Sequence, residues 1–381
     1  MKKIFYWSPH LSNVATIKNV INSAKSLKMF SKKDYEISII DTIGEWKDKK
    51  HNLNKYNVNV LSLSNLDLGN ILPITGFFKS RIFSLIILLT KFIPLKKILK
   101  KEKPDFFLMH LITTVPLIVL FFSTNKTKFI LRISGLPKLN FLRKILWKVT
   151  SKKIYLVTCP SSQTRNDLLK LKIFPKEKLK ILYDPIIEVN EISKNLKESF
   201  PQKFKDKKYF LNIGRLTKQK NQILLIKAFI KILKKYSNLD LIIIGEGEER
   251  TKLMRFVQLN NLQNKVHFLG QVKNVYPFIK NSLGVISTSL WEDPGAVMIE
   301  SSFCQKPVIS SNCPNGPKEF LSYGKGGYLF SNNDINDLEE NIITFLKDDK
   351  KNIMSKILLS KKKSKNYSMF DHYQKLNNFL Q

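Results

Sequence analysis

The stretch YFLNIGRLTKQKNQILLIKAF, residues 209–229, decides the fold of this chain. A continuous apolar run ends at Gly214, a polar loop carries Arg215 and Lys220, and an apolar pattern with helical spacing begins at Gln222. An apolar run without alternation, followed by a helix, is typical of a parallel strand that is buried on both faces. The stretch therefore predicts an α/β protein.

The same alternation recurs on both sides of this stretch. Toward the C-terminus we expect strands at Leu239–Ile244, Val266–Leu269, Leu283–Ser287 and Pro307–Ser310, and helices at Glu248–Asn260, Gly295–Cys304 and Asp337–Lys347. Toward the N-terminus we expect strands at Lys3–Trp7, Tyr35–Ile40, Asn57–Leu61, Phe106–His110, Lys128–Ile133, Ile154–Cys159 and Lys180–Leu182, and helices at Asn19–Phe30, Ser80–Lys101 and Thr164–Leu171. Strands that alternate with helices indicate parallel sheets with both faces covered.

The 381 residues are too many for one ordinary domain, and the alternation weakens between Pro185 and Lys208, which we interpret as a linker. We therefore expect two Rossmann-like, doubly wound parallel-sheet domains that face a cleft, with ligands at the carboxyl ends of the strands. The expected boundaries are 1–200 for the N-terminal domain, 201–365 for the C-terminal domain, and 366–381 for a C-terminal helix that packs back toward the N-terminal domain.

Lysine dominates the charge of the chain, which carries 58 Lys, 7 Arg and a net charge of +35. A protein that reads nucleic acid is expected to rely on Arg, because its planar fork matches phosphates and bases. We therefore expect no nucleic-acid partner. The excess is larger in residues 1–200, at +22, than in residues 201–381, at +13. It fits either a solvated Lys-rich surface or contact of the N-terminal half with an anionic membrane.

The cysteines and the apolar stretches favour a cytoplasmic protein. Cys159, Cys304 and Cys313 are widely spaced, as expected of reduced thiols rather than of a disulfide framework or a zinc site. The N-terminus reads as a short buried strand, and we expect no cleavable signal peptide. Ile82–Pro94 is too short to span a membrane, and polar residues interrupt Phe106–Phe122, which we interpret as a strand that runs into a helix.

Two cations lie on the loop that joins the deciding strand to its helix. Arg215 and Lys220 are five residues apart, so both could reach one diphosphate, with the helix N-terminus adding partial positive charge. In a Lys-rich chain such a pair also arises by chance on an ordinary surface. Taken alone, the loop leaves both interpretations open.

Two carboxylates lie eight residues apart in LWEDPGAVMIESSFC, residues 290–304. Glu292 precedes a Pro-Gly turn and Glu300 lies inside the helix that follows. The first-turn amides of that helix belong to Gly295, Ala296 and Val297. Such amides lack helical partners and suit a phosphate, while an ionised Glu accepts hydrogen bonds from sugar hydroxyls. The alternative is that Glu292 is a solvated loop acid and Glu300 a charge that favours the helix dipole.

The order of these cations and carboxylates along the chain resembles the order of motifs in a known family. NIGRLTKQKNQILLIKAF, LIIIGEGEERTKL, VHFLGQV and WEDPGAVMIESSFCQKPVISSNCPNGPKEFL are similar, in this order, to the motifs of the retaining glycosyltransferases of family 4, which have the GT-B fold. The similarity is close over Tyr209–Phe330 and extends to the rest of the chain by layout. It implies an N-terminal acceptor-side domain and a C-terminal domain that binds a nucleotide sugar.

The resemblance also implies a role for individual residues. Arg215 and Lys220 match the cations that hold the donor diphosphate, Glu300 the carboxylate that binds the ribose, and Glu292 the one near the transferred sugar. His110 matches a cleft histidine beside that sugar, although a lone His after an apolar run is as often a packed core residue. The remaining positions that match the donor-binding backbone are Gly214, Gly245, Gly295, Ala296 and Val297.

Two positions depart from the family pattern. The loop Ser8–Asn13 lacks the glycines usual after the first strand, and Pro294 stands where many members have an aromatic residue. These departures affect how the N-terminal backbone approaches the diphosphate and how the donor sugar is contacted. The resemblance further implies that the reaction retains the anomeric configuration and needs no divalent metal, so we expect no cofactor.

We therefore expect a glycosyltransferase that moves a hexose or N-acetylhexosamine, from a UDP-sugar rather than a GDP-sugar, to a glycan acceptor. A polyprenyl-diphosphate-linked acceptor in polysaccharide, O-antigen or lipopolysaccharide assembly would place the enzyme on the inner face of the membrane. Phe77–Lys103, an apolar helix with a Lys-rich end, could contact that surface, or could be a core helix with a solvated tail. Two alternatives are another nucleotide-sugar activity, such as epimerisation or hydrolysis, and a non-catalytic basic binding protein.

Overall fold

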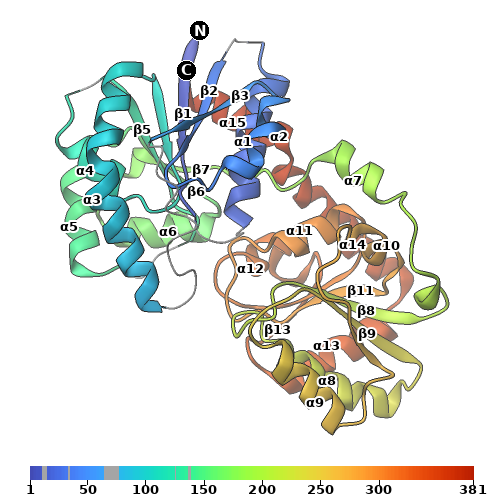
Figure 1. Ribbon diagram of the computed structural model, residues 1–381. Helices are drawn as coiled ribbons and strands as arrows, with labels where there is room; N and C mark the ends of the chain where they lie inside the picture. The colour runs from blue at the N-terminus through green and yellow to red at the C-terminus, as the bar shows by residue number, and fades with distance from the viewer. Residues whose placement is uncertain (11–14, 33–34, 64–76, 125, 136–138) are drawn as a thin grey trace. The chain divides into compact units, whose positions relative to one another are not determined.

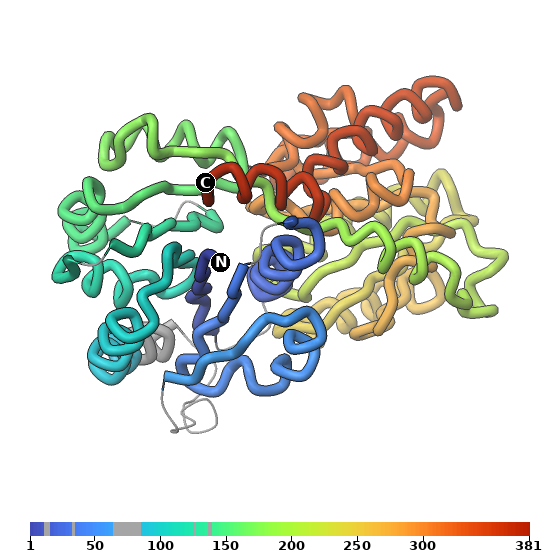
Figure 2. The backbone as a smooth tube through the Cα atoms, turned by 90° about the horizontal axis from the view of Figure 1, so that it is seen from above, coloured from blue at the N-terminus to red at the C-terminus, as the bar shows by residue number. Residues whose placement is uncertain are grey.

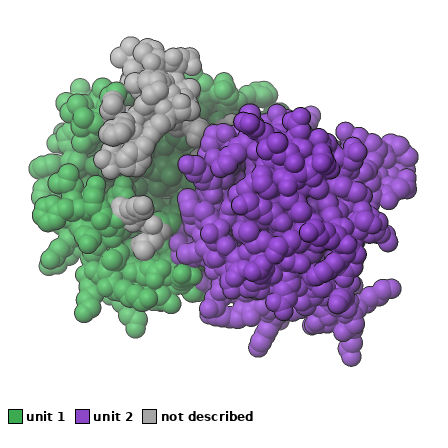
Figure 3. Space-filling model, turned by 90° about the horizontal axis from the view of Figure 1, so that it is seen from below, with its two compact units in different colours: residues 1–185, 369–381 green, residues 186–368 purple. Residues whose placement is uncertain are grey.

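The computed structural model describes residues 1–10, 15–32, 35–63, 77–124, 126–135 and 139–381. The chain divides into two compact units, residues 1–185 with 369–381 and residues 186–368 (Figure 3). Each unit is built around one parallel sheet with helices on both faces (Figure 1), which confirms the predicted fold class. The chain passes from the first unit to the second at residue 186 and returns at residue 369, whereas the sequence placed these boundaries at 201 and 366.

The first unit contains a seven-stranded sheet. Its order is β3 (Val58–Ser62), β2 (Tyr35–Asp41), β1 (Lys2–Trp7), β4 (Phe106–Met109), β5 (Lys128–Arg132), β6 (Leu156–Cys159) and β7 (Leu179–Ile181). Every neighbouring pair is parallel. From β1 the chain moves to β2 and β3 on one side and then returns to β4 on the other side of β1, so a topological switch point lies between β1 and β4.

Helices cover the two faces of this sheet, as the alternating side chains of β1 show. Phe5 and Trp7 pack against α3 (Phe77–Glu102), α4 (Thr114–Phe121), α5 (Phe141–Thr150) and α6 (Ser162–Lys170). Ile4 and Tyr6 pack on the opposite face, against α1 (Ala15–Phe30), α2 (Lys50–Asn54) and α15 (Met369–Phe379). Two apolar side-chain layers, one on each face, therefore stabilise the sheet.

The C-terminal helix α15 belongs to the first unit and packs beside α1, as Figure 2 shows. His372 on α15 is buried; its Nδ1 lies 2.7 Å from the carbonyl oxygen of Tyr183 and its Nε2 lies 2.8 Å from the hydroxyl of Ser23. That hydroxyl also contacts the buried hydroxyl of Tyr6, at 3.0 Å. Since a carbonyl can only accept, Nδ1 donates and Nε2 accepts, and the last residues of the chain complete the polar core of the first unit.

The second unit contains a six-stranded parallel sheet in the order β10 (Val266–Phe268), β9 (Leu239–Ile244), β8 (Lys208–Ile213), β11 (Gly284–Ser287), β12 (Val308–Ser311) and β13 (Tyr328–Phe330). One face is covered by α8 (Gln222–Lys235), α9 (Arg250–Leu259) and α13 (Ile335–Lys347), whose apolar side chains share a core with β8 and β9. Figure 1 shows α10 (Tyr276–Asn281), α11 (Ala296–Phe303), α12 (Pro317–Phe320) and α14 (Lys350–Ser364) on the other face.

The structure adds elements that the sequence pattern did not reveal. Strand β13 has three residues and α14 is rich in Lys, so neither shows a clear apolar period. The linker expected at Pro185–Lys208 contains the helix α7 (Val189–Asn195), and Ile187 pairs with Ser368 where the chain enters and leaves the second unit. Among the described helices, none is long and apolar enough to cross a membrane.

Candidate functional site

The second unit has a topological switch point between two central strands. From β8 the chain moves to β9 and β10 on one side, then returns to β11 on the other side of β8. The loops after β8 and β11 therefore separate at the carboxyl edge of the sheet, where open α/β sheets bind ligands. Arg215 and Lys220 lie on the first loop, and Glu292 and Gly295 lie on the second.

The glycine turn after β9 supports the loop after β8. The amide of Leu216 donates to the carbonyl of Glu246 at 2.8 Å, and the amide of Gly214 donates to Ile244 at 2.9 Å. Gly245 has φ +141°, and a Cβ there would lie 1.9 Å from the carbonyl oxygen of Gly214. Only glycine fits this contact, so the turn holds the backbone of the cation loop from behind.

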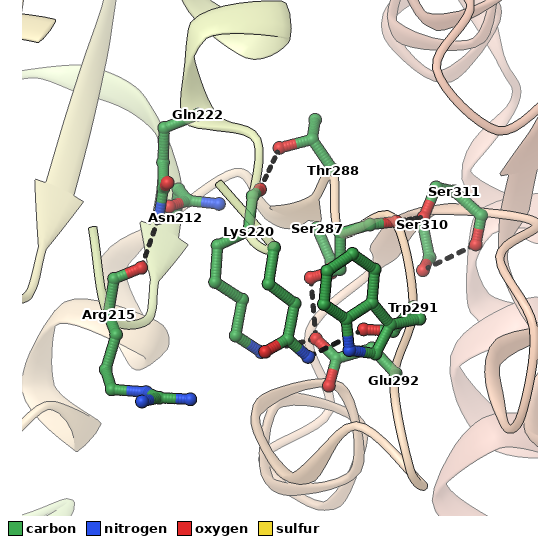
Figure 4. A network of polar contacts seen from close by, with 12 residues as sticks. Asn212, Arg215, Lys220, Gln222, Ser287, Thr288, Trp291, Glu292, Ser310 and Ser311 are labelled. Carbon is green, nitrogen blue, oxygen red and sulfur yellow. Dashed lines mark hydrogen bonds and ion pairs between the residues drawn. The ribbon is translucent and has the colours of Figure 1, made fainter. Parts of the chain in front are cut away.

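Lys220 and Glu292 form an ion pair across the switch point (Figure 4). The same carboxylate oxygen accepts a hydrogen bond of 2.6 Å from the hydroxyl of Ser289. The side chain of Glu292 is 11% exposed, so its charge is largely removed from water and depends on these two donors. Sequence reasoning placed both residues in the site but did not predict their pairing.

Backbone and side-chain hydrogen bonds join the two loops beside this ion pair. The amide of Leu290 donates to the carbonyl of Gln219 at 2.8 Å, and the hydroxyl of Thr288 donates to the carbonyl of Lys220 at 2.9 Å. The hydroxyl of Ser311, the last residue of β12, donates to the carbonyl of Ser289 at 2.5 Å. The site is therefore a framework of three strand ends that hydrogen bonds hold together.

Arg215 differs from Lys220 in its surroundings. Its side chain is exposed, and within the described part of the chain its guanidinium has no ion-pair or hydrogen-bond partner, whereas its carbonyl accepts from Gln222 at 3.0 Å. Figure 4 shows the guanidinium to the side of the Lys220–Glu292 pair. Of the two cations expected to meet a diphosphate, Arg215 is thus uncompensated, while Lys220 shares its charge with Glu292.

The helix α11 begins at the same edge. Its N-cap is Gly295, in a left-handed conformation with φ 92°, which a residue with a Cβ rarely adopts. Ala296 and Val297 form the first turn, whose amides have no partner within a helix. Gly295 and Val297 line a small cavity of about 20 Å³ together with Lys220 and Glu292. The four predicted donor-site positions are therefore neighbours.

Glu300 lies one turn further along α11 and contacts a residue that sequence reasoning missed. The hydroxyl of Tyr276, the first residue of α10, donates to Oε1 of Glu300 at 3.0 Å. Burial, together with the charge of Glu300, raises the pKa of Tyr276 well above its usual range, so this hydroxyl stays protonated and keeps donating. No signal in the sequence pointed to Tyr276, because the contact joins two separate helices.

His110 lies in the first unit, directly after β4 at that unit's own switch point. Its amide donates to the carbonyl of Trp7 at 2.9 Å, and its buried Nε2 has no hydrogen-bond partner in the described residues. Burial, and secondly the charge of Arg132, lowers the pKa of His110 to about 3, so the ring is neutral. The glycine-free loop Ser8–Asn13 is described only to His10; residues 11–14 lie outside the described part.

The site in the second unit coincides with a family match. Residues 193–357 match the family described as glycosyl transferases group 1. This matched segment lies within the second unit and contains Arg215, Lys220, Glu292 and Glu300. Its similarity to this family agrees with the expectation of a glycosyltransferase.

The similarity to named proteins extends beyond the segment that matches group 1. An uncharacterized glycosyltransferase of Methanocaldococcus jannaschii is 34% identical over 243 residues, 59% of this chain and 60% of that protein. The N-acetylgalactosamine-N,N'-diacetylbacillosaminyl-diphospho-undecaprenol 4-alpha-N-acetylgalactosaminyltransferase of Campylobacter jejuni is 27% identical over 59% of this chain and 62% of its own length. The matched segments thus span less than two thirds of these relatives.

Solved structures show the fold of the whole chain. HepE of Anabaena, crystallised in complex with UDP and glucose, superposes with a TM-score of 0.72 at 17% sequence identity and covers 99% of both chains. At that identity the likeness concerns the fold alone. Together with the two sheets described above, it confirms the predicted GT-B fold class, and the segment that matches group 1 lies within the second unit.

Proposed function

We propose that this chain is a glycosyltransferase that moves a hexose or N-acetylhexosamine from a nucleotide sugar to a glycan. The observation that carries the proposal is the group of Lys220, Glu292 and the first turn of α11 around one switch point, within the segment that matches glycosyl transferases group 1. Cations, helix-end amides and a carboxylate at a strand carboxyl edge suit the diphosphate and the hydroxyls of such a donor.

Each group has a distinct task in this proposal. Arg215 and the amides of Ala296 and Val297 bind the diphosphate, and Lys220 bridges it to Glu292, which faces the transferred sugar. Glu300, with one oxygen held by Tyr276, accepts hydrogen bonds from the ribose hydroxyls. Breaking the glycosidic bond places negative charge on the diphosphate, and preorganised donors stabilise that charge by about 3–4 kcal/mol for each critical group.

We further propose that the anomeric configuration is retained and that the family 4 course applies, in which the departing phosphate oxygen helps to deprotonate the acceptor on the same face. His110, being neutral, can exchange hydrogen bonds with a sugar hydroxyl but does not supply a positive charge. The reaction is proposed to need no divalent metal. A transfer assay with and without EDTA tests this point, because a metal-dependent enzyme loses its activity to the chelator.

The donor is proposed to be a UDP-sugar and the acceptor a glycan on a polyprenyl diphosphate. HepE was solved with UDP and glucose, and the Campylobacter relative is named for transfer of N-acetylgalactosamine to a diphospho-undecaprenol glycan. The HepE complex supports a UDP-sugar donor, and the name of the Campylobacter relative supports a lipid-linked acceptor. We propose a role in cell-envelope glycan assembly, on the inner face of the membrane.

Thermal unfolding with UDP, GDP and ADP tests the donor site. A nucleotide at about 100 times its dissociation constant stabilises the folded chain by roughly 2.7 kcal/mol, which raises Tm by a few degrees. We expect a shift with UDP that falls to about half or less in Arg215→Ala and in Glu300→Gln, because tenfold weaker binding leaves roughly 1.4 kcal/mol of stabilisation at the same concentration. No shift with any nucleotide would contradict the proposal. Release of sugar without an acceptor would instead indicate a hydrolase.

A further inference from the structure

The helix α5 exposes apolar side chains where a surface helix normally carries polar ones. Phe141 is 75% exposed and Leu142 is 74% exposed, and Ile145 and Val149 continue the same side of the helix. Trp147 is buried and anchors the opposite side in the core of the first unit. Helix α5 therefore has a buried side that packs in the core, and it carries further apolar side chains on its exposed side.

A second apolar row lies on α3, in the same helix layer. Leu85, Leu89 and Ile93 are exposed and follow one another at intervals of four residues, so they share one side of the helix. Ile87 and Leu95 lie on the buried side. We call the exposed apolar side chains of α3 and α5, with Phe121 and Phe122 at the end of α4, the apolar outer face.

The three helices form one continuous layer. Helix α4 packs against both α3 and α5, and all three cover the same face of the sheet, as Figure 1 shows. Crossover helices run antiparallel to the strands they connect, so the first turns of α5, with Phe141 and Leu142, lie toward the carboxyl edge of the sheet. His110, which directly follows β4, lies at that edge too.

The positive charge of the layer formed by α3, α4 and α5 indicates which kind of partner fits it. Among the described side chains of α3, α4 and α5, seven Lys and Arg are exposed and the single acidic residue is Glu102. Lys96 and Lys97 on α3 and Lys144 and Lys148 on α5 are exposed. Two copies of this chain joined through such a surface would bring like charges together, whereas apolar side chains within a basic border match an anionic bilayer.

We propose that the apolar outer face docks on an anionic lipid bilayer, with Phe141 and Leu142 entering the boundary between headgroups and acyl chains and the Lys side chains contacting lipid phosphates. The biological role of this docking rests on the proposed function, because docking would bring the carboxyl edge of the first unit close to a lipid-linked acceptor. Binding itself needs neither donor nor acceptor, so it is measured separately.

Vesicle flotation of the full chain tests the proposal, with vesicles of phosphatidylcholine alone and of phosphatidylcholine mixed with phosphatidylglycerol. We expect binding to the mixed vesicles, weakened by salt, and much weaker binding to phosphatidylcholine. Phe141→Ser with Leu142→Ser should lower the partition coefficient about tenfold or more. The matched control, Leu259→Ser with Leu358→Ser, removes two exposed leucines of the second unit and should bind like the unmodified chain.

Three results would overturn the proposal. One is an absence of binding to the anionic vesicles, and another is equal loss of binding in the control variant. The third is a dimer in light scattering that the Phe141→Ser, Leu142→Ser variant dissociates, because the second copy would then occupy the surface. Thermal shifts with UDP, measured on the same variants, separate these results from a failure of the proposed donor site.

Discussion

The ammonium group of Lys220 and the carboxylate of Glu292 form an ion pair that joins the loop after β8 to the loop after β11. The two residues are 72 positions apart in the sequence, and both are largely buried. Either residue, if replaced alone, leaves the other charge without its main partner. Breaking the pair from one side should therefore lower stability, and the pair also sets the charge that a donor diphosphate would meet.

Removing Lys220 should cost more stability than neutralising Glu292. Lys220→Ala leaves a mostly buried carboxylate with only the Ser289 hydroxyl as donor, and we expect the free energy of unfolding to fall by about 2 kcal/mol. Glu292→Gln releases the Lys220 charge, so UDP should bind at least as tightly while transfer slows by about 100-fold. Urea unfolding measures the change in stability, titration with UDP measures the change in affinity, and a transfer assay measures the change in rate. Equal weakening of UDP binding by both substitutions would contradict the assigned roles.

Arg215→Ala should affect binding and leave stability unchanged. The guanidinium has no partner among the described residues, so the free energy of unfolding should change by less than about 0.5 kcal/mol. Loss of a charged hydrogen bond to the diphosphate should weaken UDP binding about tenfold or more. Isothermal titration measures this, with Lys218→Ala, an exposed cation on the same loop, as the control. A similar loss in the control would indicate general charge attraction.

Glu300 should determine how strongly the ribose is recognised. Glu300→Gln is expected to weaken UDP about tenfold and 2′-deoxy-UDP much less, because only UDP offers the 2′-hydroxyl. Tyr276→Phe removes the 3.0 Å hydrogen bond that orients the carboxylate and should give a smaller change in the same ratio. Competition binding with the two nucleotides provides the measurement. An equal loss for both nucleotides would place Glu300 away from the ribose.

Gly245→Ala should destabilise the second unit through the backbone of the cation loop. The added Cβ would lie 1.9 Å from the carbonyl oxygen of Gly214, and we expect a loss of about 3 kcal/mol or more. Gly324→Ala is the matched control: it has φ +92° but no atom within 4 Å of its Cβ, so about 1 kcal/mol is expected. The midpoints of urea unfolding compare the two variants. Equal losses of unfolding free energy would mean that the contact with Gly214 does not matter.

Two buried histidines should make the first unit sensitive to acid. Burial lowers the pKa of His110 and of His372 from 6.5 to about 3. Between these values the unfolded chain binds protons that the folded chain does not. Each neutral ring therefore makes its full contribution to the free energy of unfolding above pH 6.5. This contribution is lost as the pH decreases toward 3, by about 1.4 kcal/mol per pH unit for each histidine.

His372→Asn tests this dependence, since it removes one of the two titrating rings. The slope of unfolding free energy against pH, from urea titrations between about pH 7 and about pH 5, should become shallower. His51→Asn, which replaces an exposed histidine, should leave the slope as it was. An unchanged slope in His372→Asn would contradict the prediction, because this ring would then have the same pKa in the folded and the unfolded chain.

The sequence by itself determined the fold class, because buried parallel strands produce apolar runs without alternation and helices follow them in order. The runs at Lys3–Trp7, Tyr209–Ile213 and Leu239–Ile244 each correspond to a strand. Elements without such a pattern were missed: β13 is too short, and the Lys-rich α14 has no distinct apolar side. The motifs with Arg215 and Glu292 indicated the family, since they are local in the chain.

Only the tertiary structure decided which of these residues meet. The order of strands in the sheet places the loops after β8 and β11 on either side of a switch point, and this order depends on long-range packing rather than on local periodicity. The pairing of Lys220 with Glu292 and the contribution of His372 to the first unit follow from such packing. The exposure of Phe141 does too, because an apolar residue becomes a surface feature only when its neighbours have filled the core.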